Sequence, residues 1–555
     1  MRRISPRAGY YSALVPALFF GGIVMTVYLP NMGGSGLSLP LNILSWIALC
    51  CFAILIIQAP RVWRRYRRSA SLIWLYDGCA VLVIRALLTP LPWFNDALIV
   101  AIGITAGLSF YRLLLQLPWR RQHLLAVLST VWIASVLQCF IAVIQLFHLK
   151  AAAWWEFSPA QLRPYGIFQQ VNVLASFIAC GIAATLLLLL YRSKTIPWMR
   201  ALLHISLTLQ GFILYACQSQ IGYLSTAFVI LACLGIFWQQ RFIIFSAIIS
   251  LVAGGILSFA VHVWLQFPTV VHTDSTHTRL LIWQHSWQLF SMHPLFGWGV
   301  GSFESVFLHQ FGGQITNVGI RTVSHPHNEI LLWLVEGGGF TAVGMLMLLM
   351  AIITLWLKGG RLQRAMLLTA SPVAFHMMTE FPLYQSAPHW ILLIVLLRCA
   401  DRPYSTSTVP KSMKWIRGGM IFFTVFAAGV LTQTLYLQNQ LTIVERTGTQ
   451  YDLPPRTVWQ TVLQQDRYEY DRQMGELLRF NHVQDINALR NFEHWAAGYT
   501  LRHPDNNLYA VRIQIATYLN APTQVENLTD EARWLFPADS RWTAYLDAKN
   551  DSGID

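Results

Sequence analysis

Two histidines and two glutamates stand at the edge of an apolar segment in the stretch SHPHNEILLWLVEGG, residues 324–338. Pro326 predicts an extended lead-in, and Asn328 is suited to cap a helix whose first turn holds Glu329. His327 then lies at the mouth of that helix. Because a histidine titrates near neutral pH, it can serve as a general base. A capping or interfacial histidine is an equally good interpretation of these residues alone.

Further ionisable side chains lie within apolar segments. Glu336 follows Glu329 by seven residues, which places both on one helix face, and His376 with Glu380 forms an i,i+4 pair near the end of another segment. Because ionisable groups are costly inside a membrane, they usually line a polar cavity. The pattern therefore predicts a polar site between helices, with structural ties between helices as the alternative.

The composition predicts that these segments cross a membrane. Of 555 residues, 55% are hydrophobic and only 12% are charged, which is too apolar for a soluble protein of this size. About thirteen mostly apolar stretches are each long enough to cross a hydrocarbon core of ~30 Å as a helix. Their expected cores are 10–28, 39–58, 72–88, 95–117, 122–148, 172–190, 198–217, 220–238, 242–263, 329–357, 364–381, 386–399 and 417–436. We therefore expect an all-α polytopic membrane protein.

Basic residues alternate between the loops and predict the orientation of the chain. Lys and Arg concentrate in one set of loops, whereas the opposite loops hold only Lys150, Arg163, Arg279 and Arg321. Since basic loops stay in the cytoplasm, we place the N-terminus there and the loop of residues 264–328 outside. The net charge of +14 then reflects topology and does not indicate nucleic-acid binding.

Histidines and cysteines raise the question of a metal site. Seven histidines fall between residues 272 and 327, but His325 and His327 flank a proline, and the loop lacks the clustered carboxylates of a typical divalent-metal site. All eight cysteines lie inside or at the ends of apolar segments, so neither a disulfide framework nor a CxxC metal site is implied. We expect no bound metal.

Four regions follow from these patterns. Residues 1–263 form an N-terminal transmembrane bundle, 264–328 an external loop, 329–436 the remaining spans and 437–555 an external tail. In the loop, Arg279 opens an amphipathic helix that can lie along the membrane surface. The tail carries a charge of −5 against +19 for the rest, and its apolar residues recur at three and four spacing. It predicts a small helical domain, either a solvated appendage or a partner-binding module.

The spacing of four residues resembles the signature of the bacterial O-antigen ligase and polymerase superfamily. That signature is His, then Asn, Ser or Gln, nine residues, Gly, two residues, then Gly, Thr or Tyr; His327, Asn328, Gly338 and Thr341 fill it in register. The stretches RPYGIFQQVNVLASF from Arg163 and HMMTEFPLY from His376 resemble motifs of its pilin glycosylation ligases, which are protein O-oligosaccharyltransferases. With the tail, the resemblance covers nearly the whole chain.

This resemblance implies a glycosyltransferase of the inner membrane of a Gram-negative bacterium, with its active site in the periplasm. The implied reaction moves a glycan from a polyprenyl diphosphate carrier to a Ser or Thr hydroxyl of a periplasmic or type IV pilin-like protein, without a cofactor. By motif position, His327 matches the catalytic histidine and Arg279 an arginine that holds the diphosphate. Gln220 stands where family members often carry a second arginine, so this chain has either lost that group or moved its task to Arg163 or Arg321.

One base and one or two guanidinium groups suffice for this reaction, because a diphosphate is already a good leaving group. We expect His327 to take the acceptor proton while Arg279, with Arg321 or Arg163, neutralises the diphosphate. Direct displacement then inverts the anomeric centre. The residues expected to orient the base or to bind sugar hydroxyls are His325, Asn328, Glu329, Glu336, His376, Glu380, Gln169 and Asn172.

Two alternatives stay open. Within the same superfamily, the chemistry is the joining of O-antigen to lipid A core or the polymerisation of repeat units; the TEFPLY stretch and the helical tail favour a protein acceptor instead. In a different class, the chain is a transporter or lipid flippase. Such proteins usually show two related halves and binding groups near the bilayer midplane, whereas here polar residues concentrate at the external edge and no halves repeat.

Overall fold

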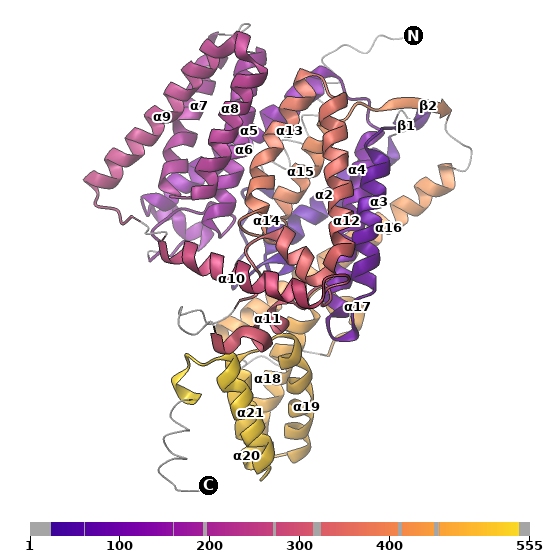
Figure 1. Ribbon diagram of the computed structural model, residues 1–555, viewed down its shortest axis with the longest axis vertical. Coiled ribbons are helices and arrows are strands. Elements are labelled where there is room, and N and C mark those ends of the chain that lie inside the picture. The colour runs from indigo at the N-terminus through magenta and orange to yellow at the C-terminus, as the bar shows by residue number, and fades with distance from the viewer. Residues whose placement is uncertain are drawn as a thin grey trace.

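The computed structural model describes residues 24–59, 62–158, 160–192, 197–269, 273–314, 323–408, 413–448, 453 and 455–542. Nearly all regular structure in these residues is helical, and long helices stand side by side in a bundle with a group of shorter helices at one end (Figure 1). The bundle helices are α2 (Pro40–Gln58), α3 (Leu72–Leu87), α4 (Phe94–Leu115), α5 (Arg121–Leu146), α6 (Val171–Arg192), α7 (Pro197–Ala216), α8 (Gln220–Ile236), α9 (Arg241–Trp264), α12 (Glu329–Lys358), α13 (Arg361–Met377), α15 (Ala387–Ala400) and α16 (Met413–Thr447).

The expectation of an all-α polytopic membrane protein is confirmed. Eight helices among the described residues are long and apolar enough to cross a membrane. Each expected core from 39–58 onward coincides with one of the bundle helices. The shorter of these helices, such as α15 with 14 residues, fall below that length. Because the expected core 10–28 lies mostly outside the described residues, the number of thirteen crossings stays a prediction.

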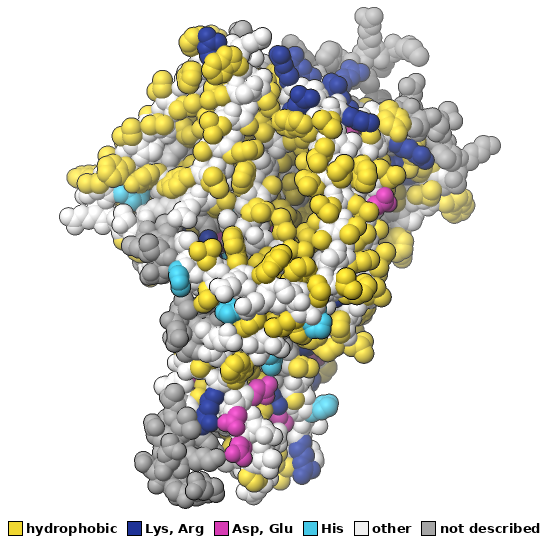
Figure 2. All heavy atoms as spheres, viewed as in Figure 1, with side chains coloured by type: hydrophobic (Ala, Val, Ile, Leu, Met, Phe, Trp, Pro, Cys, Tyr) yellow, Lys and Arg dark blue, Asp and Glu magenta, His cyan; other side chains and the backbone are white. Residues whose placement is uncertain are grey.

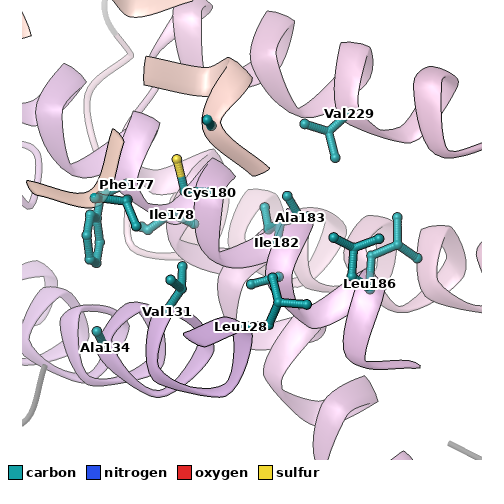
Figure 3. Close-up of a cluster of buried hydrophobic side chains, with 14 of the residues drawn as sticks. Leu128, Val131, Ala134, Phe177, Ile178, Cys180, Ile182, Ala183, Leu186 and Val229 are labelled. Carbon is teal, nitrogen blue, oxygen red and sulfur yellow. The ribbon is translucent and has the colours of Figure 1, made fainter. Parts of the chain in front are cut away.

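Helix α6 is the centre of the bundle, because its apolar span is buried throughout. A helix that is apolar on all sides can bury every face, and α5, α7, α8 and α13 pack around α6. Figure 3 shows Ile178 and Ile182 of α6 in this core, with Val131 of α5 on one side and Val229 of α8 on the other. This burial fixes the position of the polar residues at the start of α6.

The structure adds one short antiparallel sheet that the sequence did not predict. Strand β1 (Arg65–Arg68) pairs with β2 (Tyr404–Thr408), and a bulge interrupts the register between Tyr66 and Arg67. The pair joins two basic loops at the end of the bundle opposite the tail (Figure 1). On the face shown in Figure 2, Lys and Arg side chains gather at that same end.

The expected surface helix is α10 (Thr273–Met292), which runs across the end of the bundle nearest the tail (Figure 1). A loop of close backbone contacts then leads to α11 (Phe303–Phe311). Trp298 N donates to the carbonyl of Val335 in α12 at 3.0 Å, and Gly339 N of α12 donates back to the carbonyl of Pro294 at 2.7 Å. Loop and helix therefore interlock through their backbones.

Gly338 makes this interlock possible by breaking α12. Its φ of +65° and ψ of −160° lie inside the helix span, in a region that only glycine adopts readily. A Cβ atom at this position would lie 2.5 Å from the carbonyl carbon of Leu295. Thr341 closes the kink, because its hydroxyl donates to the carbonyls of Trp333 and Gly338 at 2.6 and 2.9 Å. The last two positions of the ligase signature thus specify a kinked helix that holds the loop.

We expect Gly338→Ala to lower the free energy of unfolding by at least about 2 kcal/mol, since it adds backbone strain and a clash with backbone atoms. The matched control is Gly429→Ala in α16, where the added methyl meets no described atom within 4 Å. That control should be neutral or slightly stabilising, because alanine favours a helix over glycine. Thermal unfolding of the full chain in detergent measures both. Equal midpoints for the two variants would contradict this account of the kink.

The tail folds into the small helical domain that the sequence predicted. It contains α17 (Val458–Thr461), α18 (Gln465–Val483), α19 (Ile486–Arg502), α20 (Asn506–Tyr518) and α21 (Pro522–Leu535). Successive helices from α18 to α21 pack on one another, and α11 packs against α19 and α21. Helix α16 runs to Thr447, past the expected boundary at 436, and contacts α17 and α18. Tail and bundle are therefore joined by a continuous helix and by the loop that contains α10 and α11.

A charged clasp joins the tail to this loop. His503 follows α19, and its two ring nitrogens face Glu304 of α11 at 3.3 Å and Asp466 of α18 at 3.7 Å. Arg502 also binds Asp466, at 2.7 Å. Although burial opposes its charge, hydrogen bonds with Asp466 and Glu304 raise the pKa of His503 to about 9. The imidazolium is therefore the stable form at neutral pH.

This clasp predicts a pH-dependent attachment of the tail. The pKa of His503 is about 9 when folded, above the unfolded value of 6.5. The protonated ring of His503 therefore stabilises the attachment of the tail by about 3 kcal/mol. This stabilisation is complete below pH 6.5 and is lost as the pH rises through 9. Asp466 stays ionised throughout this window, because its own pKa is lowered to about 2. Hydrogen exchange in α11 and α19 should accelerate between pH 6.5 and 9.5 beyond the intrinsic rate, and His503→Gln should abolish that excess.

Candidate active site

The buried carboxylate of Glu380 collects donors from three separate segments. Its Oε1 accepts hydrogen bonds from Arg279 of α10 at 3.0 Å and from Asn172 of α6 at 2.7 Å. Its Oε2 accepts one from Gln170 at 2.8 Å and lies 3.6 Å from His376 Nε2. The side chain of Arg279 keeps 32% of its surface exposed, against 5% for Glu380. The guanidinium is thus paired with a carboxylate and still reachable by a ligand.

Local structure brings these groups to one end of the bundle. Gln170 and Asn172 stand at the start of α6, and Ser219, which caps the start of α8, donates to Asn172 at 2.7 Å. Glu380 follows the end of α13 and is held there by a hydrogen bond from its backbone N to the carbonyl of His376 at 2.9 Å. The site is therefore built from helix ends, where backbone and side-chain polar groups are available.

His327 lies close enough to Arg279 and Glu380 for both charges to act on it. Its backbone is left-handed, at φ +52°. Histidine adopts that region more readily than most residues, and Trp283 of α10 holds the preceding turn by donating to the carbonyl of Pro326 at 2.8 Å. The Nδ1 atom of His327 is buried and has no hydrogen-bond partner among the described residues. Burial lowers the pKa of His327, while the charge of Glu380 raises it and that of Arg279 lowers it. The side chain is a neutral imidazole, the form that accepts a proton.

The neighbours of His327 fix the start of α12 to the segment that carries Glu380. Asn328 caps α12 as expected, and its Nδ2 donates to the carbonyl of Met378 at 3.0 Å. Glu329 is buried and accepts a hydrogen bond from the backbone N of Leu383 at 2.9 Å. Both side chains thus bridge α12 to residues on either side of Glu380.

His325 packs in the same place as an uncharged ring. It lies edge-on against Phe381, and its ring centroid is 4.4 Å from that of His327. Burial, followed by the repulsion between the rings of His325 and His327 in their protonated forms, lowers the pKa of His325 to about 3. His325 therefore supports the position of His327 and carries no charge at neutral pH.

Behind Glu380 runs a row of buried polar side chains. His376 Nδ1 lies 2.9 Å from the hydroxyl of Ser176, which lies 3.1 Å from His389 Nε2, and His389 Nδ1 lies 2.9 Å from the hydroxyl of Ser386. All four side chains are buried. The row gives His376 Nδ1 and both ring nitrogens of His389 a partner, and it leaves His376 Nε2 facing Glu380 at 3.6 Å.

Glu336 lies farther along α12 and contacts the loop before α11. Its Oε1 accepts a hydrogen bond from Phe303 N at 3.3 Å, and its carbonyl accepts one from Arg85 of α3 at 3.0 Å and one from Gly299 N at 2.9 Å. The sequence suggested that Glu336 orients the base or binds sugar. Its described contacts belong to the interlock between α12 and the loop, and its part in orienting the base or binding sugar stays a prediction.

The other expected diphosphate ligands are placed differently. Arg163 donates to the carbonyl of Cys217 at 3.3 Å, at the end of α7. Ser219 lies two residues beyond Cys217 and contacts Asn172. Arg163 therefore borders the Glu380 cluster, which consists of Glu380, Arg279, Gln170, Asn172 and His376. Arg321 lies outside the described residues.

Sequence reasoning missed several members of the site. Gln169 adopts a left-handed backbone at φ +59°, and it is the next residue, Gln170, that binds Glu380. Ser219 adjoins Gln220, the position noted for its missing arginine. The stretch QQVN holds both amides that bind Glu380. In the sequence, Glu380 was visible only as one half of an i,i+4 pair with His376, and not as the centre of the site. No local pattern in the sequence marks Ser219 as a partner of α6.

Three family models match the chain. The model for protein glycosylation ligase matches residues 164–189, the model for O-antigen ligase matches 205–346, and the model for the C-terminal part of a virulence factor membrane-bound polymerase matches 364–550. They confirm the resemblance carried by the motifs. No curated protein matches the chain.

The three matched regions meet at one place in the fold. Gln170 and Asn172 belong to the first, Arg279 and His327 to the second, and Glu380 to the third. These families imply glycosyl transfer. Fold and matches together define a multi-pass membrane protein similar to O-antigen ligases and, among them, to protein glycosylation ligases.

Proposed function

We propose that this chain is an O-linked oligosaccharyltransferase that moves a glycan from a polyprenyl diphosphate carrier to Ser or Thr hydroxyls of a periplasmic or pilin-like protein. One observation carries the proposal: the neutral ring of His327 lies in the field of the partly exposed guanidinium of Arg279 and the buried carboxylate of Glu380. These groups supply a base, an anion ligand and a charge that stabilises the protonated base.

In this proposal His327 takes the proton of the acceptor hydroxyl as its oxygen attacks the sugar carbon. The bond between that carbon and the diphosphate oxygen breaks, and the diphosphate leaves with the electron pair, held by Arg279. Direct displacement inverts the anomeric centre. A diphosphate needs no protonation to leave, so a single base is enough, and neither a metal nor a cofactor is needed.

The ion pair between Arg279 and Glu380 gives donor binding a second effect. When the diphosphate draws on the charge of Arg279, Glu380 retains its contacts with Gln170, Asn172 and His376. Its negative charge is then less compensated, which raises the proton affinity of nearby His327. Donor binding thereby strengthens the base before the acceptor is deprotonated.

The proposed orientation places this site in the periplasm and the N-terminus in the cytoplasm. It is supported by the positions of the tail and of α10, which carries Arg279, near one end of the bundle, and of the basic side chains at the other end (Figures 1 and 2). Such an arrangement follows the preference of basic loops for the cytoplasm. It lets the tail reach an acceptor protein, a role that deletion of residues beyond 447 would test through acceptor choice.

The test is intact mass spectrometry of a co-expressed pilin-like acceptor in cells that make a polyprenyl-linked glycan. The expected result is a glycan-sized mass gain on the acceptor with the wild-type chain and none with His327→Asn. Membrane levels of both proteins serve as the control. An acceptor that stays unmodified despite confirmed donor and expression would overturn the proposal.

Lipid A core is the second candidate acceptor, and repeat-unit polymerisation the third reaction. They are favoured by the matches to the O-antigen ligase model and to the polymerase C-terminal model. Lipopolysaccharide gels from the same cells distinguish them. A ladder on lipid A core without modified protein would indicate the ligase reaction, and longer carrier-linked chains alone would indicate polymerisation.

A further inference from the structure

His376 Nε2 is a buried polar atom that has no hydrogen-bond partner among the described residues. Its side chain is completely buried, and Nε2 faces Glu380 Oε2 at 3.6 Å. This distance lies beyond the usual range of a hydrogen bond, and Oε2 accepts one from Gln170 at 2.8 Å instead. Because buried polar atoms are nearly always paired, an unpaired nitrogen beside a charged site indicates a contact that forms in another state of that site.

The other ring nitrogen of His376 belongs to a chain of buried contacts through three helices. His376 Nδ1 in α13 lies 2.9 Å from the hydroxyl of Ser176 in α6, which lies 3.1 Å from Nε2 of His389 in α15. His389 Nδ1 lies 2.9 Å from the hydroxyl of Ser386, which caps the start of α15. Both α6 and α15 pack on α13. Nδ1 of His376 is therefore occupied, and Nε2 is the nitrogen left for Glu380.

The hydrogens of this chain determine what Nε2 offers to Glu380. The Ser176 hydroxyl has one hydrogen, which can go to His376 Nδ1, to His389 Nε2 or to the carbonyl of Val173 at 3.1 Å. In the first case the hydrogen of the neutral His376 ring is on Nε2. In the other two cases Nδ1 must donate to Ser176, and Nε2 carries a hydrogen if the ring is an imidazolium. A bare Nε2 would be repelled by the carboxylate it faces, so the stable arrangements direct an N–H group to Glu380.

Glu380 needs this donor most when Arg279 binds an anion. In the structure, Arg279 balances the charge of Glu380 at 3.0 Å. In the proposed reaction the diphosphate draws on that guanidinium, and a buried carboxylate that loses its cation tends to take up a proton. Protonated Glu380 would no longer raise the proton affinity of His327. A small movement of Glu380 toward His376 Nε2 would instead form a charge-assisted hydrogen bond, of the kind that often tightens only in the ligand-bound state.

We propose that His376 is a positioning residue that keeps Glu380 ionised while Arg279 binds the diphosphate. Ser176 and His389 hold its ring for this task. The proposal rests on the proposed function for its donor, and it assigns the buried chain a part in the strength of the base. A chain that only ties α6, α13 and α15 together is the alternative that the experiments must separate from it.

Four charged or titratable side chains act on Glu380 from the elements around it. They are Arg279 of α10, His376 of α13, and His325 and His327 before α12. Arginine stays charged at every pH of interest. A change in the pH profile therefore reports on Glu380 and the histidines, and variants of His376 and Glu380 assign it between them.

The first experiment measures kcat for His376→Asn and His376→Gln with a polyprenyl diphosphate glycan and one acceptor peptide. Asparagine keeps an amide near the place of Nδ1, whereas glutamine is long enough to bring its amide nitrogen to the place of Nε2. For His376→Asn, kcat at about pH 6 should fall about 10-fold and return to within about twofold of wild type at about pH 9, where Glu380 ionises again. His376→Gln should stay within about threefold of wild type throughout. KM for the donor should not rise in either variant, because Arg279 is intact.

Two further variants assign the effect. Glu380→Gln should lower kcat at both pH values without recovery, and adding His376→Asn to it should change kcat little, because both act through one charge. His204→Asn is the matched control, since His204 ties α7 to α9 through the hydroxyl of Ser250 at 2.8 Å and lies outside the Glu380 cluster. It should leave kcat and its pH profile unchanged.

Difference infrared spectroscopy of the full chain with saturating inorganic pyrophosphate tests the same point without catalysis. The Glu380 signal is assigned by its loss in Glu380→Gln. At about pH 6, wild-type Glu380 should stay a carboxylate whose band shifts when pyrophosphate binds, whereas His376→Asn should gain a protonated carboxyl band. This measurement on the wild type remains decisive if His376→Asn fails to fold.

Equal loss of kcat in His376→Asn and His376→Gln, or a loss in His376→Asn that does not recover with pH, would overturn the proposal and leave the chain as a tie between helices. So would a protonated Glu380 in the wild type, or no response of Glu380 to pyrophosphate. The expected infrared bands without transfer of any glycan would support the role of His376 and remove the proposed function only.

Discussion

Replacing His327 with Asn is expected to lower the rate of glycan transfer by about 10²- to 10⁴-fold, the usual contribution of a positioned base. Asparagine is the sharper substitution, because it tolerates the left-handed backbone at φ +52° and cannot accept a proton near neutral pH. Alanine at this position adds backbone strain to the loss of the base. The measurement is the single-turnover rate of transfer from a polyprenyl diphosphate glycan.

Two controls distinguish the loss of the general base from a change in the folding of the variant. His482→Gln changes an exposed histidine at the end of α18 and should leave the rate unchanged. Thermal unfolding of His327→Asn should match the wild type. In addition, the wild-type kcat/KM, which reports the free enzyme, should fall at acidic pH only below pH 6.5, because the lowered pKa of His327 keeps its ring neutral above that value. A rate within threefold of wild type for His327→Asn would exclude it as the base.

Arg279→Ala is expected to lower kcat/KM for the donor by about 10²- to 10³-fold, the loss typical of removing one group that stabilises developing negative charge. Arg279→Lys should recover part of this, because an ammonium group keeps the charge but not the planar fork that binds phosphate oxygens in pairs. The effect should appear in KM for the donor as well as in kcat, with KM for the acceptor unchanged.

The pairing of Arg279 with Glu380 makes this prediction sharper. Arg279→Ala leaves a buried carboxylate with only Gln170, Asn172 and His376 as partners. The double variant Arg279→Ala, Glu380→Gln should therefore be more stable than Arg279→Ala alone, with a coupling of roughly 1 to 3 kcal/mol. Arg472→Ala is the control, since that arginine pairs with Glu469 across one turn of α18 at the surface. Unchanged donor kinetics in Arg279→Ala would remove the anion-binding role.

Much of the fold followed from hydropathy, because each apolar stretch must bury its backbone polar groups in a helix to enter a membrane. The same requirement holds for any chain with such stretches, and hydropathy therefore predicted the positions of the bundle helices from α2 to α16. The paired strands β1 and β2 escaped prediction, since four or five polar residues in a basic loop carry no strand pattern. The length of α16 was also missed, because it continues for 11 residues beyond the last apolar core at 436.

The sequence by itself determined the membrane helices, the cap position of α12 and the identity of His327, Arg279 and Glu380 as polar groups near one face. Those properties are local, since they depend on spacing within one helix. Only the tertiary structure decided that Glu380 is the common partner of Arg279, Asn172 and Gln170, and that Glu336 belongs to another contact. Such partners lie up to 210 residues apart, and their meeting depends on how the helices pack around α6.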